Sequence, residues 1–452
     1  MAQVYPFRAF RYRPEHAHAP FERLLTQPYD KISPAMQEKY YAADAHNLIS
    51  VEKGRAHPGD TPQNNVYTRA AASLQDWIAQ HVVMQDPEPA FYGYTQEYTV
   101  PGSDERRTRR GFIGAGKLEE YSAGVVFRHE HTLSGPKADR LEMLRHTKTH
   151  TGQLFMLYSD EERRVDTILQ QAEANAAPVT EMRDEYDVVH RLWMFAEPER
   201  VTAIQKAMAE QKLVIADGHH RYETALNYRN ECRAKAGKTI PDAPQERAMM
   251  TFVNTRSEGL TILPTHRVAA HLHDFNWTEV RRHLEPWFAA EKFSFADEHS
   301  QAGARRNFLA RLVQARSRRA IGAYPAADAL NRAYYVLLLR EGADLARLLP
   351  SVSPLQRELD VVLLHEGILE PALGITPQSV TAEANLTYER EAAVALNAVD
   401  SGAAEVAFLL NACDVEQVMK IATLGEVMPQ KSTDFFPKLL SGITMYRVDG
   451  AA

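Results

Sequence analysis

The sequence contains very little cysteine: Cys232 and Cys413 are the only two in 452 residues. Two cysteines cannot build a disulfide framework or a thiolate zinc site, so both kinds of cross-linked architecture are excluded. Long apolar runs are also missing, since no stretch approaches the roughly 18 uninterrupted apolar residues of a membrane-spanning helix. The opening "MAQVYPFRAFRYRPEHAHAP" has no apolar core of the kind that signal peptides carry. We therefore expect a cytoplasmic protein with no membrane partner.

An excess of positive charge is absent as well. The 52 Lys and Arg residues against 59 Asp and Glu residues give a formal net charge of −7. Nucleic-acid-binding domains usually carry a pronounced basic patch. The short basic runs "ERRTRR" and "RSRR" are better interpreted as solvated surface. We therefore expect no nucleic-acid partner.

Length and the order of elements predict two lobes of mixed α/β structure. A chain of 452 residues exceeds what one hydrophobic core usually serves. Short apolar runs such as "KLVIA" and "EVAFLLNA" are typical of buried strands, and amphipathic helical patterns alternate with them. We predict an N-terminal α/β lobe, residues 1–240, and a second, intimately packed α/β lobe, residues 241–452. The sequence leaves the oligomeric state open.

Local patterns predict several individual elements. Ser33 followed by Pro34 is typical of an N-cap and a first helical residue. The run "HNLISVEKG", residues 46–54, has the pattern of a short strand. Two β-rich runs about "PGSDE", within residues 90–120, predict a hairpin. Asp414 is a plausible N-cap for the helix in "DVEQVMKIATLG".

The densest group of ionisable residues follows a short apolar strand, in "LVIADGHHRYETAL". A strand that ends at Asp217 and passes directly into a helix points free backbone N–H groups and the positive end of the helix dipole outward, which favours a phosphate. Gly218 lets a ligand approach the backbone, and Arg221 can bind phosphate oxygens in a bidentate way. His219 and His220 can donate hydrogen bonds or act as acid and base. In the simpler interpretation, Asp217 only caps the helix and the histidines satisfy local polar groups.

A protein-held metal is not expected at this turn. Neighbouring histidines diverge on a regular helix, so His219 and His220 are poorly placed to bind one ion together. Helical metal-binding pairs prefer a spacing of four residues, as in His-Glu-x-x-His. We predict no metal site made by protein side chains alone.

A second cluster lies in "FRHEHTLSGPKADRLEMLRHTKTH". His129, Glu130 and His131 alternate, so on an extended segment the two histidines would share one face and Glu130 would oppose them. Lys137 and Arg140 follow in a turn that opens a helix. So many cations beside a few acids predict an anionic ligand. The alternative is a solvated polar helix and a loop.

Two further stretches have the composition of ligand-binding segments. Lys431, Ser432 and Thr433 in "MPQKSTDFFPKLLSG" supply an ammonium group and hydroxyls for phosphate oxygens, but the glycine spacing of a P-loop is missing, so a Walker-type NTPase is not supported. His266 and Arg267 in "ILPTHR" lie at a strand end, where ligands often gather in α/β folds. We predict them, with His129 and His131, as substrate-binding residues.

Six segments, in this order, resemble the bacterial and archaeal family catalogued as domain of unknown function 1015. They cover nearly the whole chain: "QPYDKIS", "HNLISVEKG", "HEHTLSGPKADRL", "ADGHHRYETAL", "LPTHR" and "MPQKSTDFFPKLLSG". The family name implies no activity. More distantly, "ADGHHR" resembles a turn of the ADP-dependent free-serine kinases, which belong to the ParB/sulfiredoxin-like superfamily. His219 stands where sulfiredoxins have their cysteine, so the resemblance does not extend to sulfinic-acid reduction.

The distant resemblance implies a ParB/sulfiredoxin-like nucleotide-binding core in which residues 217–221 bind the phosphates of ADP or ATP, with Mg²⁺. The serine kinases take a glutamate base from an N-terminal segment, and Glu52 in "SVEKG" is the residue that this sequence offers. In the residue-based hypothesis, Asp217 or Glu130 is the base or metal ligand, and His219 or His220 stabilises the transferred charge.

We therefore expect a nucleotide-dependent phosphotransferase that acts on a small hydroxylated metabolite such as serine. Its phosphate-binding residues would be Gly218, Arg221, Lys137, Arg140 and the Lys431–Thr433 loop. Two other functions stay open: a regulatory protein that binds or hydrolyses a nucleotide, and a phosphatase of a small phosphorylated metabolite.

Overall fold

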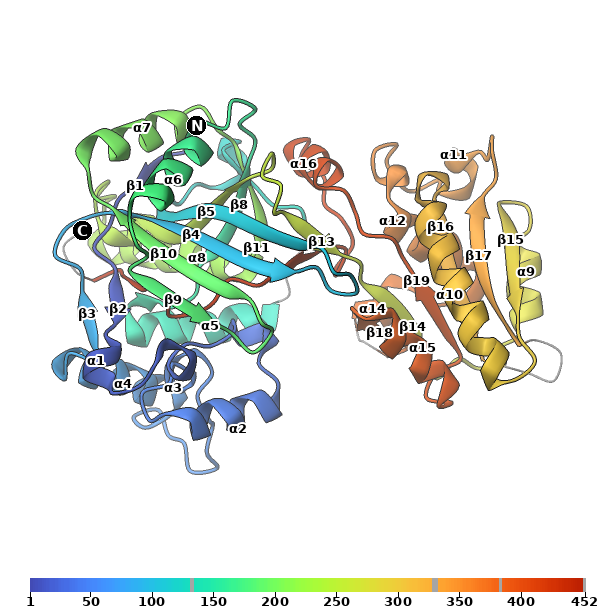
Figure 1. The fold of residues 1–452 in the computed structure, drawn as a ribbon, viewed down its shortest axis with the longest axis horizontal. Coiled ribbons are helices and arrows are strands. Elements are labelled where there is room, and N and C mark those ends of the chain that lie inside the picture. Colours follow the sequence, from blue (N-terminus) through green and yellow to red (C-terminus); the bar gives the residue numbers. More distant parts are fainter. Residues whose placement is uncertain (131–133, 327–331, 382–383, 450–452) are drawn as a thin grey trace. The chain divides into compact units, whose positions relative to one another are not determined.

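The structure, a computed structural model, describes residues 1–130, 134–326, 332–381 and 384–449. The chain forms two units, each of which combines helices with a β-sheet (Figure 1). Unit 1 consists of Met1–Thr261 and Phe435–Ala452, and unit 2 consists of Ile262–Asp434. The predicted mixed α/β class is confirmed.

Most strands of unit 1 join one large mixed sheet. The strands of the unit are β1 (Val4–Tyr5), β2 (Phe10–Tyr12), β3 (Val83–Gln85), β4 (Phe91–Thr99), β5 (Arg106–Lys117), β6 (Val126–Phe127), β7 (Thr149–His150), β8 (Leu154–Tyr158), β9 (Thr180–Arg183), β10 (Val189–Phe195), β11 (Leu213–Asp217), β12 (Arg247–Asn254) and β21 (Tyr446–Arg447). The nine-stranded sheet has the order β6-β11-β8-β12-β5-β4-β10-β9, with β1 paired to β5. Pairs β6–β11 and β8–β12 are parallel, and the other pairs of this sheet are antiparallel. Two small ribbons, β2–β3 and β7–β21, complete the strands.

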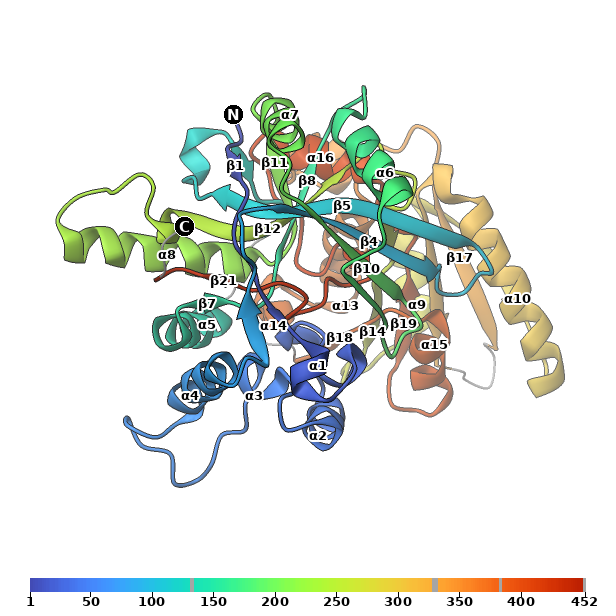
Figure 2. The same ribbon diagram turned by 60° about the vertical axis from the view of Figure 1, so that its left-hand side comes forward.

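Helices lie on both sides of this sheet. The helices of unit 1 are α1 (Pro14–Ala17), α2 (Pro34–Ala43), α3 (Ile49–Glu52), α4 (Val66–Ala79), α5 (Ser134–Thr147), α6 (Arg164–Asn175), α7 (Pro198–Met208) and α8 (His219–Ala236). Figure 2 shows α6 and α7 along one face of the sheet and α4 beside α5 on the opposite side. The core under α6 and α7 contains alternate residues of each strand, as the two-residue period of a strand requires, for example Leu154, Met156 and Tyr158 of β8.

Unit 2 is built on a six-stranded antiparallel sheet of order β15-β17-β16-β19-β14-β18. Its strands are β14 (His266–Ala269), β15 (Phe288–Ser294), β16 (Ala320–Pro325), β17 (Ala333–Leu339), β18 (Leu386–Glu389) and β19 (Val406–Leu409), while β13 (Thr261–Leu263) and β20 (Asp434–Phe436) carry the chain across the unit boundaries. Its helices are α9 (Trp277–Leu284), α10 (Glu298–Gln314), α11 (Leu345–Leu348), α12 (Asp360–Leu364), α13 (Glu370–Leu373), α14 (Pro377–Thr381), α15 (Ala392–Asp400) and α16 (Val415–Thr423), with a π-helical turn at His365–Leu369. Phe308 of α10 stacks on Tyr334 of β17, and Leu396 of α15 belongs to the same core.

The units divide the chain differently from the lobes 1–240 and 241–452 expected from the sequence. Strand β12 lies beyond residue 240, but it pairs with β5 on one side and β8 on the other, which ties it to unit 1. The final segment from Phe435 also belongs to unit 1. Unit 1 is therefore made from both ends of the sequence, and unit 2 is inserted between them.

Three of the four local predictions are confirmed and one is wrong. Ser33 caps α2, the hairpin consists of β4 and β5, and Asp414 forms a capping box at the start of α16. The predicted strand at residues 46–54 is instead the one-turn helix α3. Its start is set by Asn47, whose side-chain oxygen accepts a hydrogen bond of 2.9 Å from the Ile49 amide, the local competition that makes asparagine favour turns over strands.

Among the described residues, no helix combines the length and the apolar character that crossing a bilayer demands.

Substitution of Gly259 tests how tightly the chain packs against β5, and substitution of Gly303 is the control. A Cβ atom on Gly259 would lie 2.0 Å from the Thr108 carbonyl oxygen on β5, whereas a Cβ on Gly303, inside α10, would have nothing within 4 Å. Gly259→Ala should therefore destabilise the protein by about 1–3 kcal/mol or more. Gly303→Ala should stabilise it by about 0.5–1 kcal/mol. Chemical denaturation of both variants measures this, and equal effects of the two substitutions would contradict the packing described.

Candidate functional site

The turn between β11 and α8 presents the amino end of an 18-residue helix. Gly218 occupies the N-cap position with φ of +92°, a left-handed conformation that costs glycine little, and no side chain caps this helix end. A Cβ atom at Gly218 would lie 3.1 Å from Nε of Arg221. The amino end of α8, with the positive end of the helix dipole, has the character of the helix ends that bind anions in other proteins.

Asp217 ends β11 and is surrounded by cations of unit 1. Nη2 of Arg221 donates to its Oδ2 atom at 3.0 Å, and Nζ of Lys438 lies 3.4 Å from its Oδ1 atom. Burial alone would raise the pKa of Asp217, but Lys438, Arg221 and Lys31 together hold it well below its usual value. One carboxylate faces three cations at this turn. Arg221 also lies near the carboxylates of Asp30 and Glu52, so several acids share these cations beside the amino end of α8.

A small cavity of about 50 Å³ adjoins Arg221. Glu52 of α3 is 2% exposed and lines it. Three donors hold the Glu52 carboxylate: the Tyr29 amide at 3.2 Å, the Thr151 hydroxyl at 2.6 Å and the Ser441 hydroxyl at 2.9 Å. A carboxylate has about four acceptor positions, so this arrangement orients Glu52 and leaves room for one more proton donor.

Arg140 lies at the same cavity. Its Nη1 atom donates to the main-chain oxygen of Glu52 at 2.9 Å, and its guanidinium stacks 4.4 Å from the centre of the Tyr29 ring. Its Nε atom donates to Asp139 at 2.9 Å. The predicted phosphate-binding residues Arg221 and Arg140 are therefore brought to one cavity, together with Glu52.

Gly152 lies close to both Arg221 and Glu52. A Cβ atom there would lie 3.1 Å from Nη1 of Arg221 and 3.6 Å from Oε1 of Glu52. Beside it, burial and the neighbouring charge of Arg221 lower the pKa of His150 to about 4. His150 is therefore neutral near pH 7 and can act there as a hydrogen-bonding group but not as a cation.

His129 and His219 lie together behind Asp217, with ring centres 4.7 Å apart. Nδ1 of His129 lies 2.7 Å from the Ile215 carbonyl oxygen, so this nitrogen is the protonated one, and the His129 amide donates to Nε2 of His219 at 3.4 Å. Burial lowers the pKa of His129 to about 4 and the pKa of His219 well below its usual value. Both rings are neutral near pH 7, so they can donate or accept hydrogen bonds but do not add charge to the site.

Three further residues of the predicted site are Lys137, Glu130 and His220. Nζ of Lys137 contacts Glu223 on α8 at 2.9 Å, which joins α5 to α8. Glu130 follows His129 directly and is half-buried, and His220 is half-buried in the first turn of α8. His131 lies outside the described residues.

The side chains of His266 and Arg267 make hydrogen bonds to other residues of unit 2. Arg267 is fully buried and donates to Nε2 of His365 at 3.1 Å and to the carbonyl oxygen of Lys431 at 3.1 Å. His266 accepts a hydrogen bond from the Leu410 amide at 3.3 Å, and burial lowers its pKa to about 4. Arg267 thus holds the backbone of the Lys431–Thr433 loop, so its guanidinium is used inside the fold.

The Lys431–Thr433 loop also belongs to unit 2. Lys431 has a left-handed backbone with φ of +57° and an exposed side chain. The Ser432 hydroxyl donates to the Pro429 carbonyl and is buried. Thr433 is half-buried. A phosphate-binding role for this loop stays a prediction.

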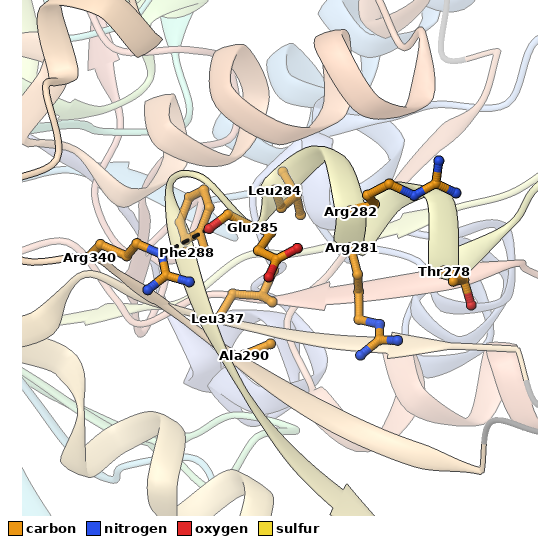
Figure 3. A pocket seen from close by; sticks show the side chains of 9 residues that line it. All are labelled: Thr278, Arg281, Arg282, Leu284, Glu285, Phe288, Ala290, Leu337 and Arg340. Carbon is orange, nitrogen blue, oxygen red and sulfur yellow. Dashed lines mark hydrogen bonds between the residues drawn. The ribbon is translucent and has the colours of Figure 1, made fainter.

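Unit 2 has a separate surface hollow of about 400 Å³ beside α9 and β15 (Figure 3). Arg281 and Arg282 stand in the last turn of α9, where cations stabilise the negative end of the helix dipole. Arg282 also pairs with Glu279, and Nε of Arg340 donates to the Glu285 carbonyl oxygen at 2.8 Å, the dashed line in Figure 3. Arg282 and Arg340 thus make contacts that support the fold.

A comparison with protein-family models identifies the chain. The model described as "Protein of unknown function (DUF1015)" matches residues 4–362. The chain belongs to this family. The resemblance predicted from its six segments is confirmed. A comparison of the DUF1015 chain with curated proteins gives no match.

Several solved structures resemble the DUF1015 chain at low identity. A conserved hypothetical protein from Pyrococcus furiosus is 14% identical with a TM-score of 0.33, covering 73% of this chain and 94% of that one. A free serine kinase mutant in complex with ADP is 12% identical with a TM-score of 0.34, covering 75% and 92%. SbnI from Staphylococcus aureus, truncated at its C-terminus, is 9% identical with a TM-score of 0.32, covering 73% and 85%. Similarity at this level assigns no role to any residue here, so function is argued from the site itself.

Two important site residues were not among the sequence predictions of catalysis or binding. Lys438 lies in the segment "MPQKSTDFFPKLLSG", and its contact with Asp217 spans 221 positions of the chain. Glu52 was suggested only by resemblance. The sequence cue for Glu52 is a charged residue in "VEK" directly after an apolar run. A carboxylate at such a position needs hydrogen-bond donors around it when it is buried.

The neutrality of His129 gives a pH prediction. Its pKa rises from about 4 in the folded protein to the ordinary 6.5 on unfolding, so the unfolded chain binds an extra proton between these values. Stability from this group is therefore complete above about pH 6.5 and lost as the pH falls towards 4. Between about pH 8 and about pH 5, the free energy of unfolding should fall by about 2 kcal/mol more in the wild type than in His129→Asn.

Urea unfolding at the two pH values measures this difference. His46, which is partly exposed beside Asp44, provides the control substitution His46→Asn. Equal pH dependence of the wild type and His129→Asn would contradict a buried neutral His129.

Proposed function

We propose that unit 1 is a nucleotide-dependent phosphotransferase that transfers a phosphoryl group to the hydroxyl of a small metabolite such as serine. The observation that carries the proposal is the junction of two features. One is the helix end at Asp217–Arg221, which carries the positive end of the α8 dipole and the cation Arg221. The other is a small cavity beside Arg221 that holds an oriented buried carboxylate, Glu52. We also propose that unit 1 has a ParB/sulfiredoxin-like nucleotide-binding core, as the resemblance of residues 217–221 implies.

The helix end supports binding of nucleotide phosphates. Phosphoryl transfer requires positioning and neutralisation of charge more than a strong nucleophile. The amides after Gly218 and the cations Arg221 and Lys438 supply both. In this proposal they bind the terminal phosphates of ADP or ATP, and Arg140 neutralises charge at the acceptor side. Asp217 keeps the two cations in place before the nucleotide binds.

Glu52 supports the chemical step. In the proposed reaction, the substrate hydroxyl gives its proton to Glu52 while its oxygen bonds to the terminal phosphorus. The bond from that phosphorus to the bridging oxygen breaks, and the electron pair stays on the shortened nucleotide, where Arg221 and Lys438 balance it. The hydrogen bonds from Thr151 and Ser441 hold the carboxylate in one orientation, which reduces the cost of reaching the reactive geometry. The cavity of about 50 Å³ supports a substrate of only a few heavy atoms.

Mg²⁺ fits the proposal only together with the nucleotide. This ion usually keeps several waters and binds one or two carboxylates plus substrate phosphates. Within the described part of the chain, no three His, Cys, Asp or Glu side chains gather to hold a metal ion, and both oxygens of Asp217 face cations. Asp217 would provide one ligand, and the bound ion would add positive charge at the phosphates.

The remaining predicted residues take narrower roles. We propose His219 as a neutral hydrogen-bond donor near the phosphates, oriented by its contact with His129. His220 and Glu130 stay candidate acid–base groups. Lys137, His266 and Arg267 support the fold in the contacts described above, and the Lys431–Thr433 loop stays a candidate second phosphate-binding segment.

Removing one cation of the helix end should weaken nucleotide binding. Arg221→Ala and Lys438→Met should each lower the affinity for ADP by about 10–100-fold, the scale of a hydrogen bond to a charged group. Isothermal titration calorimetry measures the affinity. Arg191→Ala, which removes a partly exposed arginine paired with Glu181 on the edge of the sheet, is the control and should change nothing. Unchanged affinity in both site variants would remove the basis of the proposal.

Glu52→Gln separates chemistry from binding. It keeps the size of the side chain but cannot accept the hydroxyl proton, so phosphoryl transfer to a panel of hydroxylated amino acids and hydroxy acids should fall by about 100-fold or more while ADP affinity stays within about twofold. Glu246→Gln is the matched control, because Glu246 is also a buried glutamate of unit 1 and pairs with Arg233. Nucleotide binding without transfer in the wild type would favour a regulatory protein, and release of phosphate from phosphoserine without nucleotide would favour a phosphatase.

A further inference from the structure

A buried arginine with an unusual set of acceptors lies beside the site. Arg109 on β5 is 1% exposed. Its acceptors in the described structure are neutral: the Gln96 side-chain oxygen, the Phe436 carbonyl and the Pro437 carbonyl. Burial lowers its pKa to about 10, so it remains charged near pH 7. Burying a charge without a carboxylate partner costs free energy, so hydrogen bonds to other acceptors have to offset that cost.

That geometry holds the C-terminal segment Phe435–Ser441, which we name the strap. Nη1 of Arg109 donates to the Phe436 carbonyl at 3.2 Å, and Nη2 donates to the Pro437 carbonyl. Gln96, the cross-strand partner of Arg109 on β4, donates from Nε2 to the Lys438 carbonyl at 2.7 Å. Three consecutive carbonyls of the strap are therefore held by one pair of side chains. The planar guanidinium group presents its N–H donors in a fixed fork and reaches two of these carbonyls at once.

The strap delivers two side chains to the site. Lys438, only 9% exposed at its side chain, reaches Asp217, and Ser441 reaches Glu52. Beyond Lys438, Gln153 donates to the Leu440 carbonyl at 3.0 Å and the Ser441 amide donates to the Thr26 carbonyl at 3.0 Å. The far end of the strap thus has its own anchors. At the end that carries Lys438, Arg109 and Gln96 hold the carbonyls, and the rings of Phe435 and Phe436 pack against Phe155 and Tyr98.

We propose that Arg109 is a positioning residue that fixes the strap so that the Lys438 ammonium group stands at the phosphate site. This inference rests on the proposed function for the identity of the ligand. It assigns to Arg109 an action through Lys438, with no contact of its own to the nucleotide. Arg110, the next residue of β5, points to the other face and pairs with Glu173 of α6 at 2.7 Å, so the same strand provides a matched control.

The first test measures the strap without any nucleotide. In hydrogen–deuterium exchange of the whole protein, Arg109→Met should increase exchange in peptides that cover residues 436–442 and leave those of α6 and α7 unchanged. Arg110→Met should leave the strap at the wild-type rate. Gln96→Leu, which releases only the Lys438 carbonyl, should give a smaller increase and serves if Arg109→Met does not fold. Wild-type exchange of the strap in both Arg109→Met and Gln96→Leu would overturn the positioning role.

The second test is a double-mutant cycle on ADP affinity. Arg109→Met and Lys438→Met should each weaken ADP binding by about 10-fold or more, and the double variant should be no weaker than Lys438→Met alone, because both remove the same ammonium group from the site. Additive losses would mean that Arg109 acts independently of Lys438, which contradicts the inference. If Lys438→Met leaves the affinity unchanged, the proposed function fails, and the exchange experiment still decides whether Arg109 fixes the strap.

Discussion

The site of unit 1 depends on one electrostatic arrangement: the half-buried carboxylate of Asp217 between the guanidinium of Arg221 and the ammonium of Lys438. The three groups come from the end of β11, the first turn of α8 and the C-terminal strap. In the proposed function, these two cations and the amino end of α8 bind the phosphates of the nucleotide. The placement of Glu52, Arg140 and the small cavity has functional meaning only beside this charge.

The fold explains why such distant residues meet. The large sheet of unit 1 is made from strands of the first 261 residues, and the chain returns to unit 1 at Phe435, after unit 2. Buried polar groups hold the returning strap by its carbonyls, and the hydroxyls of Thr151 and Ser441 hold Glu52. In a low-dielectric interior each of these groups would be costly without its partner. The polar network therefore specifies one geometry of the site as well as stabilising it.

Local signals in the sequence predicted local structure well. The strand–turn–helix at Asp217 and Gly218 follows from an apolar run that ends in Asp-Gly, and the caps at Ser33 and Asp414 follow from side-chain chemistry within three residues. The strand predicted around Glu52 was wrong because its apolar run is short, and a short apolar run does not distinguish a strand from a turn of helix. Lys438 and Arg109 were missed for another reason: their partners are fixed by tertiary packing, and nothing in their neighbourhood along the chain marks them.

The most direct measurement is a crystal structure of the protein with ADP bound. The account predicts that the terminal phosphate lies at the first-turn amides of α8, within hydrogen-bonding distance of Arg221 and Lys438, with the neighbouring cavity at Glu52 open to a small hydroxylated molecule. A nucleotide bound elsewhere on the chain, with Asp217, Arg221 and Lys438 unchanged and free of contact with it, would contradict the account.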